Sequence, residues 1–141
     1  MRPRLRAIGA GAAAALVWGA LEPLDRRLIR HDYSDVAVLG KAFTQGPGWR
    51  PLGLAMHALN GAIFGLVYHE IRGRTSRDPR RLALELALLE HLALFPAGRW
   101  VDRHHPARGQ PGVVRLFCLP AFGQATVRHA VFGKLLGAGA N

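Results

Sequence analysis

The sequence has a single cysteine among its 141 residues. One thiol forms no internal disulfide, and it cannot supply the several thiolates that a zinc finger or an iron–sulfur cluster requires. Lysine is almost as rare, because Lys41 and Lys134 are the only lysines among the 19 basic residues. These shortages exclude disulfide-linked scaffolds and thiolate metal centres, and they make arginine the main source of positive charge.

Acidic residues are few as well, with 9 against 19 basic residues, so the formal net charge is +10. A strongly basic chain is typical of proteins that bind nucleic acid or a membrane surface. Apolar residues make up 50% of the sequence, too large a share for a disordered chain, and the length fits one domain. The positions of the arginines relative to the apolar residues therefore distinguish the two classes.

Uninterrupted apolar runs are missing, but four mostly apolar segments account for most of the chain. They predict spans over residues 5–21, 51–71, 82–97 and 113–136. A transmembrane helix needs about 20 mainly apolar residues, a length that the second and fourth segments reach and the other two do not. Arginines lie between the segments rather than along them, which argues against binding of nucleic acid. We therefore expect a single all-α domain, residues 1–141, that forms an integral membrane bundle of four transmembrane helices.

The tryptophans and arginines predict how the spans are oriented. If the spans alternate in direction, Trp18, Trp49 and Trp100 fall on one face of the membrane, and tryptophan prefers the membrane–water interface. The opposite face receives the arginine-rich N-terminus, the basic loop 72–81 and the C-terminus. By the positive-inside rule this face is cytoplasmic, which predicts a bacterial inner-membrane protein with both termini in the cytoplasm. The first external loop is also basic, which counts against this predicted orientation.

Shorter features complete the expected architecture. The first external loop predicts an interfacial helix over about residues 35–43, with Asp32 and Ser34 as its caps. Residues 98–112 predict an irregular loop, and Pro120 predicts a kink in the fourth span. Small residues recur every four positions in the first two spans, which indicates close helix packing inside the bundle in preference to a dimer interface. They are Ala7, Gly11, Ala15, Gly19, Gly53, Gly61 and Gly65.

Polar residues inside the spans form the main candidate ligand site. At about 1.5 Å per residue, His57, Asn60, Glu90, His91 and Gln124 all fall in the outer half of the bilayer. Two imidazoles and a carboxylate suit a divalent metal, a proton relay or a polar ligand, and His57 and His91 lie at matching depths for haem ligation. No metal motif such as HExxH accompanies them. The sequence therefore identifies no cofactor. It favours the alternative that these residues form hydrogen bonds between helices and bind no ligand.

Two further constellations are candidates. Glu85 and Arg128 fall at similar depths in antiparallel spans, which predicts an ion pair that stabilises the bundle. Asp102, His104 and His105 lie in the loop after the third span, as a candidate surface metal or acid–base site, although such a loop is more often a solvated turn. No serine or cysteine lies beside a base in a nucleophile motif, so the sequence favours a protein that is not an enzyme.

The layout resembles that of small four-span bacterial membrane proteins that are uncharacterised. The similarity covers most of the chain and is carried by the segments WGALEPLDRRL, HDYSDVAVLGKA, GPGWRPLGLAMHALNGAIFGLVY and WVDRHHPARG. The resemblance implies an integral membrane location and no more, and it assigns no role to any residue.

We therefore expect a small binding or transport-accessory protein with a polar intramembrane cluster. Its expected partner is the lipid bilayer, with a second copy of the chain or a larger membrane complex as further partners. The alternative is a structural subunit of such a complex, whereas a membrane-embedded enzyme or a soluble nucleic-acid-binding protein fits the sequence less well.

Overall fold

A computed structural model describes residues 2–140, and every regular element in this range is a helix. An isolated bridge between Tyr33 and Gly112 is the nearest approach to a strand within these residues. The expected all-α class is confirmed. The helices are α1 (Pro3–Ile29), α2 (Asp35–Lys41), α3 (Trp49–Arg72), α4 (Pro79–Leu94), the 3₁₀ turn η1 (Phe95–Ala97), α5 (Gly98–His104) and α6 (Leu119–Gly139).

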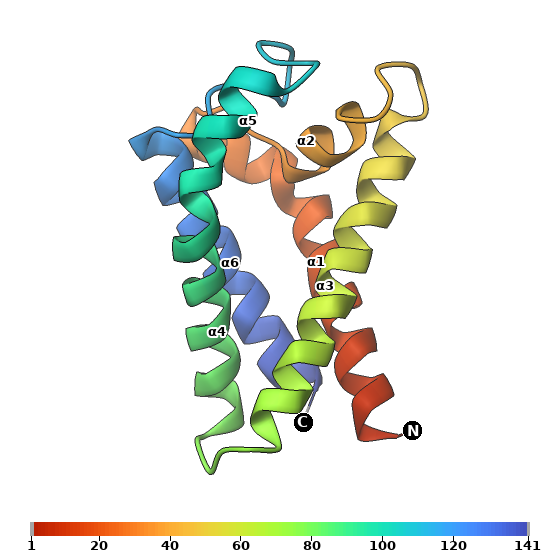
Figure 1. The fold of residues 1–141 in the computed structure, drawn as a ribbon, viewed down its shortest axis with the longest axis vertical. Coiled ribbons are helices and arrows are strands. Elements are labelled where there is room, and N and C mark those ends of the chain that lie inside the picture. The colour runs from red at the N-terminus through yellow and green to blue at the C-terminus, as the bar shows by residue number, and fades with distance from the viewer. Residues whose placement is uncertain (1, 141) are drawn as a thin grey trace.

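The four longest helices lie side by side, with the short helices α2 and α5 at one end (Figure 1). The first residues of α1, the loop between α3 and α4 and the last residues of α6 lie at the opposite end. Helix α1 packs along α3, α4 packs along α6, and α1 joins the two pairs through α6. Helices α3 and α4 touch at only a few points. The molecule is therefore two helix pairs that are closed on one side and separated on the other.

Small residues bring α1 and α3 into backbone contact. A Cβ atom added at Gly11 would lie 2.0 Å from the carbonyl oxygen of Gly61, and one added at Gly65 would lie 2.2 Å from that of Ala7. Side chains larger than hydrogen at these glycines would force the two helices apart. The prediction that the small-residue stripes pack within one molecule is confirmed for these two helices.

The helix boundaries differ from the predicted spans. Helix α1 runs through Pro23 to Ile29, so Trp18 lies in the middle of the helix. The predicted orientation had assumed that Trp18 lies at the end of the first span. Helix α6 begins at Leu119, later than the predicted start, and Pro120 therefore occupies its first turn, where proline causes no kink. Residues 98–104, predicted to be irregular, form α5.

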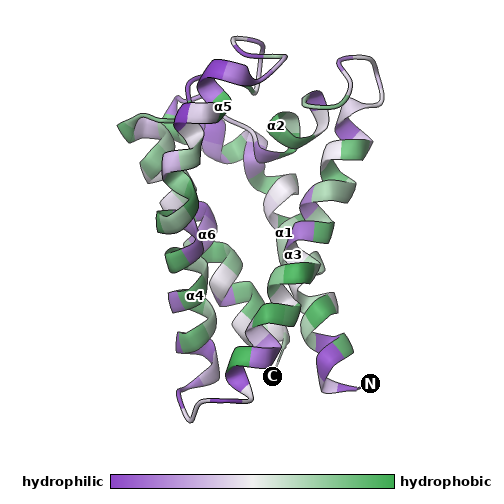
Figure 2. Cartoon of the chain, viewed as in Figure 1, coloured by the Kyte–Doolittle hydropathy of each residue, from purple (hydrophilic) through white to green (hydrophobic). Residues whose placement is uncertain are grey.

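Apolar residues occur along all four long helices (Figure 2), but length and composition separate these helices into two kinds. Helices α1 and α3 are long and apolar enough to cross a membrane. Helix α4 has only 16 residues, and α6 carries Gln124, Arg128 and Lys134, which lower its hydropathy. By length and composition alone, the described residues therefore supply two candidate spans of the four expected.

The segment before α2 fixes the α2/α5 end of the molecule. Ser34 caps α2 by accepting a hydrogen bond from the amide of Ala37, as the sequence predicts. Asp32 does not cap the helix. Its carboxylate instead accepts hydrogen bonds from the Arg26 guanidinium and from the amide of Gly112, 3.0 Å away. Asp32 therefore joins the end of α1 to the loop before α6.

The Asp32 contacts predict an acid-sensitive contribution to stability. Partial burial acts to raise the pKa of Asp32, but the hydrogen bonds from Arg26 and Gly112 outweigh it and hold the pKa below its usual value. The stabilisation is therefore complete above the unfolded-state pKa of about 3.9 and is lost as the pH falls through the folded-state pKa. We expect Asp32→Asn to lower the melting temperature at neutral pH and to leave it unchanged in acid, at a pH below the pKa of Asp32 in both the folded and the unfolded state. A difference that is equally large in acid would contradict this assignment.

Candidate ligand pocket and its buried arginine

A cavity of about 530 Å³ lies between α3 and α4, with α1 and α6 behind it. Its walls are mostly apolar, and Leu59, Ile63 and Leu94 form part of the lining although each is more than half exposed. These three residues belong to α3 and α4, so the cavity opens on the side where the two helices separate. The end of the cavity towards α2 and α5 is lined by Val38 and Val101.

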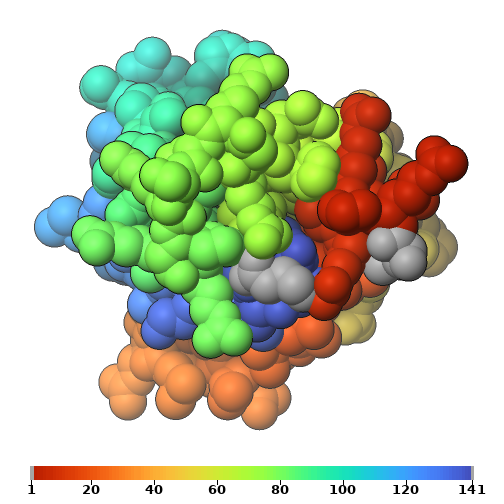
Figure 3. Space-filling view, turned by 90° about the horizontal axis from the view of Figure 1, so that it is seen from below, coloured from red at the N-terminus to blue at the C-terminus, as the bar shows by residue number. Residues whose placement is uncertain are grey.

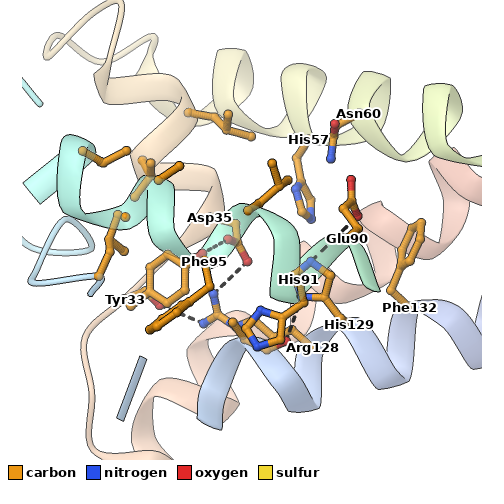
Figure 4. A pocket seen from close by; sticks show the side chains of 18 of the residues that line it. Tyr33, Asp35, His57, Asn60, Glu90, His91, Phe95, Arg128, His129 and Phe132 are labelled. Carbon is orange, nitrogen blue, oxygen red and sulfur yellow. Dashed lines mark hydrogen bonds and ion pairs between the residues drawn. The ribbon is translucent and has the colours of Figure 1, made fainter. Parts of the chain in front are cut away.

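Four of the five predicted cluster residues line this pocket. His57 and Asn60 project from α3 and Glu90 projects from α4 towards them, whereas the ring of His91 is turned towards α6 (Figure 4). Gln124 lies elsewhere: its amide nitrogen donates to Asp25, 3.1 Å away, and its side chain is fully buried. The depth argument therefore grouped four residues correctly and misplaced Gln124, which points from α6 towards α1.

The imidazole of His91 is held by its neighbours. Its Nε2 lies 3.0 Å from the hydroxyl of Thr126, and its ring packs 5.0 Å from that of His129 and 4.8 Å from that of Phe122. Within residues 2–140 no three histidine, cysteine or carboxylate side chains are grouped so that they could hold a metal ion. The metal interpretation of the cluster thus gains no support from its geometry, and haem ligation would require His91 to leave Thr126.

A buried arginine lies beside the pocket at the centre of a charge network. The Nε and Nη2 atoms of Arg128 donate to the two carboxylate oxygens of Asp25, at 2.7 and 2.9 Å. Its Nη1 donates to Asp35 at 2.8 Å, and Nη2 also donates to the backbone carbonyl of Tyr33 at 2.8 Å. Glu22 approaches Nη1 at 3.7 Å. The Arg128 side chain, only 2% exposed, therefore ties α6 to α1 and α2.

Asp35 and Tyr33 are fixed in definite protonation states by this network. Burial acts to raise the pKa of Asp35, but the Arg128 guanidinium and the Tyr33 hydroxyl outweigh it, so the pKa lies below its usual value. Burial, with the negative charge of Asp35 added, raises the pKa of Tyr33 well above its usual range. Asp35 is therefore an anion at neutral pH, and the neutral Tyr33 hydroxyl donates a hydrogen bond to it.

The predicted pair of Glu85 and Arg128 is wrong. Glu85 instead accepts hydrogen bonds from Arg77 and from Arg81, at 2.8 and 2.9 Å, close to the loop between α3 and α4. Because α6 begins at Leu119, Arg128 is nearer to the α2/α5 end than the predicted span implied. The two side chains therefore lie at different depths.

The acidic partners of Arg128 were missed by the sequence analysis. Glu22 and Asp25 were assigned to the loop after the first span, yet they lie in α1 and are 3% and 7% exposed. Their spacing of three residues places them on one helix face if the helix continues through Pro23. That spacing, opposite a lone arginine inside the fourth apolar segment, is the signal that could have identified them.

The loop residues Asp102, His104 and His105 do not form one site. Asp102 accepts hydrogen bonds from the amides of Leu116 and Phe117, at 2.6 and 2.9 Å. His104 stacks on the Trp100 ring, and the Nε2 of His105 lies 2.8 Å from the carbonyl oxygen of Val38. Each of the three side chains contacts a different segment at the α2/α5 end of the molecule, so we assign them structural roles.

No protein-family model matches the sequence, and comparison with curated proteins and with solved structures finds no significant match. The resemblance to small four-span membrane proteins therefore stays a prediction. The geometry of the pocket carries the functional inference by itself.

Proposed function

We propose that this chain is a four-span integral membrane protein that binds a small, mostly apolar molecule in the pocket between α3 and α4. The observation that carries the proposal is the pocket itself, an apolar cavity that opens sideways between two helices and has polar side chains at mid-height. Pockets of a few hundred Å³ with apolar walls and a few convergent polar groups are typical ligand sites. A purely structural subunit needs no such cavity.

The distribution of apolar side chains supports four spans. Large apolar residues are exposed along all four long helices, whereas Gln124, Arg128 and His91 are buried. Several of the polar residues that lower the hydropathy of α4 and α6 thus face the interior, whereas the exposed Lys134 lies near the C-terminal end of α6. Such an arrangement suits a lipid environment, where polar groups face the inside of the bundle. The exposed apolar residues on these helices include Leu16, Val17, Leu21, Leu24, Leu59, Ile63, Val67, Leu89, Leu92, Val127 and Leu135.

The first residues of α1, the loop between α3 and α4 and the last residues of α6 meet at one end of the molecule (Figure 3), and the arginines in these segments support a cytoplasmic location for that end. Arg6 and Arg72 donate hydrogen bonds to the carbonyls of Gly139 and Ala140 and so close the C-terminal end of α6. The loop between α3 and α4 adds further arginines. We propose that this end faces the cytoplasm of a bacterial cell, since positive charge favours that side of the inner membrane.

Quenching of Trp18 tests access to the pocket from the bilayer. Trp18 lines the cavity and is 6% exposed, so lipid outside the protein does not touch it. A variant with Trp49→Phe and Trp100→Phe keeps Trp18 as its single tryptophan. In vesicles of phosphatidylcholine with brominated acyl chains we expect its fluorescence to be quenched, because an apolar chain enters between α3 and α4.

Two substitutions on α6 control this experiment. Ala125→Phe fills the cavity that Ala125 lines and is expected to abolish the quenching, with Ala121→Leu as the milder plug if the first variant does not fold. Val127→Phe adds a phenyl ring to the same helix on its exposed side and should leave the quenching intact. Equal quenching in the plugged and open proteins, or none in either, would overturn the proposed function.

A further inference from the structure

Carboxylates outnumber cations in and behind the pocket wall. Glu22, Asp25 and Asp35 surround Arg128, and Glu90 stands on α4 facing α3. The other titratable side chains in the pocket lining are the Tyr33 phenol and the imidazoles of His57, His91 and His129. Three of these carboxyl groups share the Arg128 guanidinium, and Glu90 has no guanidinium beside it among the described residues.

Arg128 cannot serve as the receptor for an anion. Four of its five N–H groups already donate to protein acceptors, and Glu22 lies 3.7 Å from the Nη1 atom that carries the fifth. The rings of Tyr33 and Trp18 cover its planar group at 4.5 and 5.6 Å. An anionic ligand would therefore meet no available cation from this residue.

Glu90 is the carboxylate that is open to a ligand. Its ion-pair partner in the described part of the chain is His129, whose Nε2 lies 3.8 Å away, and no hydrogen bond holds it there. Its side chain is 24% exposed and projects into the pocket towards His57 and Asn60 (Figure 4). Glu90 thus presents carboxylate oxygens to the pocket that accept no hydrogen bond from the described residues.

His57 offers a second acceptor on the opposite wall. Its ring donates a hydrogen bond to the backbone carbonyl of Ala15, while its Nε2 is buried and has no partner within residues 2–140. A carbonyl only accepts, so the proton lies on Nδ1 and Nε2 keeps its lone pair. Phe95 and Phe132 add aromatic faces and edges to the lining (Figure 4). Aromatic faces attract cations through the ring quadrupole.

We propose that the ligand is a lipophilic cation, a protonated amine or an onium group on an apolar body, whose charge lies against Glu90 between α3 and α4. The inference rests on the proposed function, because that function supplies the pocket. The apolar body occupies the cavity, and the cationic group meets Glu90, with His57 accepting a hydrogen bond where the ligand has an N–H to donate.

A matched pair of ions tests the sign of the ligand charge. Tetraphenylphosphonium and tetraphenylborate have nearly the same size and shape and opposite charges. Equilibrium dialysis against the full-length protein in a non-ionic detergent, corrected with protein-free micelles, gives both affinities. We expect the cation to bind at least about 10-fold more tightly than the anion, which corresponds to about 1.4 kcal/mol.

Two substitutions on α4 locate the charge that matters. Glu90→Gln keeps the size of the side chain and is expected to weaken phosphonium binding about 10-fold. Glu85→Gln removes a carboxylate from the same helix at a site already held by Arg77 and Arg81, and it should change the affinity little. An equal loss in both variants, or none in Glu90→Gln, would overturn the assignment of Glu90.

The two proposals fail in different ways. Equal binding of the two ions, tighter binding of the borate, or binding of neither ion overturns the cation inference. If Trp18 is still quenched by brominated lipid in the same preparation, the proposed pocket function stands. If neither ion binds and Trp18 is not quenched, both proposals are wrong.

Discussion

Replacing Arg128 by methionine is expected to lower the free energy of unfolding by about 3–5 kcal/mol, the usual cost of removing one partner from a buried ion pair. The substitution leaves Asp25 and Asp35 buried near Glu22 without the guanidinium that balances them. It also removes the contacts by which α6 holds α1 and α2 at one end of the molecule. Equilibrium unfolding in mixed detergent micelles measures the loss.

The control for this prediction lies on the same helix. Lys134→Met removes a positive charge from an exposed position of α6 and should change stability by no more than about 0.5 kcal/mol. In a double-mutant cycle, Arg128→Met and Asp25→Asn should be strongly non-additive because the two side chains form a bidentate pair. Arg128→Met combined with Glu85→Gln should be additive. Coupling to Glu85, or a loss below about 1 kcal/mol for Arg128→Met, would contradict the network described above.

The network and the pocket share a wall, and this links stability to binding. Arg128 fixes Asp35 and the backbone of Tyr33, and both residues line the cavity together with Trp18. One buried guanidinium thus balances the carboxylates around it and holds this wall in place, whereas Glu90 on α4 has only the imidazole of His129 as its ion-pair partner among the described residues. Glu90 is therefore the carboxylate that a cationic ligand would meet.

The sequence predicted where the long helices lie but not where each begins and ends. Apolar segments are sufficient to locate α1, α3, α4 and α6, because a helix that exposes apolar residues on most sides must be largely apolar. The first span was ended at residue 21, although α1 continues through Pro23 to Ile29, and Pro120 was expected to kink a span, although it lies in the first turn of α6. Proline is accepted in a first helical turn and is also tolerated inside helices whose freed carbonyl is satisfied elsewhere, so residue type alone does not decide between the two.

The candidate site was predicted in part, for a related reason. Depth along a span depends only on the rise per residue, and it grouped His57, Asn60, Glu90 and His91 although their helices had not been placed. Depth says nothing of the direction in which a side chain points around its helix. Gln124 was therefore assigned to the pocket although it faces α1. An offset of six residues at the start of the fourth helix was enough to pair Arg128 with the wrong carboxylate.

The contact between α1 and α3 yields the second large prediction. Gly11→Ala should destabilise the protein by about 3 kcal/mol, at the upper end of the usual cost of overpacking, because the new methyl group would lie 2.0 Å from the carbonyl oxygen of Gly61. That oxygen belongs to the backbone of a long helix, so it cannot turn aside as a side chain does. The two helices must separate, and the surrounding contacts must be lost with them.

Gly9→Ala is the matched control, two residues earlier in the same helix. A Cβ atom at Gly9 would meet no atom within 4 Å, so the substitution adds only the better helix propensity of alanine and should leave stability unchanged or raise it slightly. Unfolding of both variants in the same detergent mixture gives the comparison. Equal stability of the two would mean that α1 and α3 do not meet at Gly11 and Gly61. Because α1 also carries Trp18, a separation of α1 from α3 should alter the Trp18 emission in Gly11→Ala and not in Gly9→Ala.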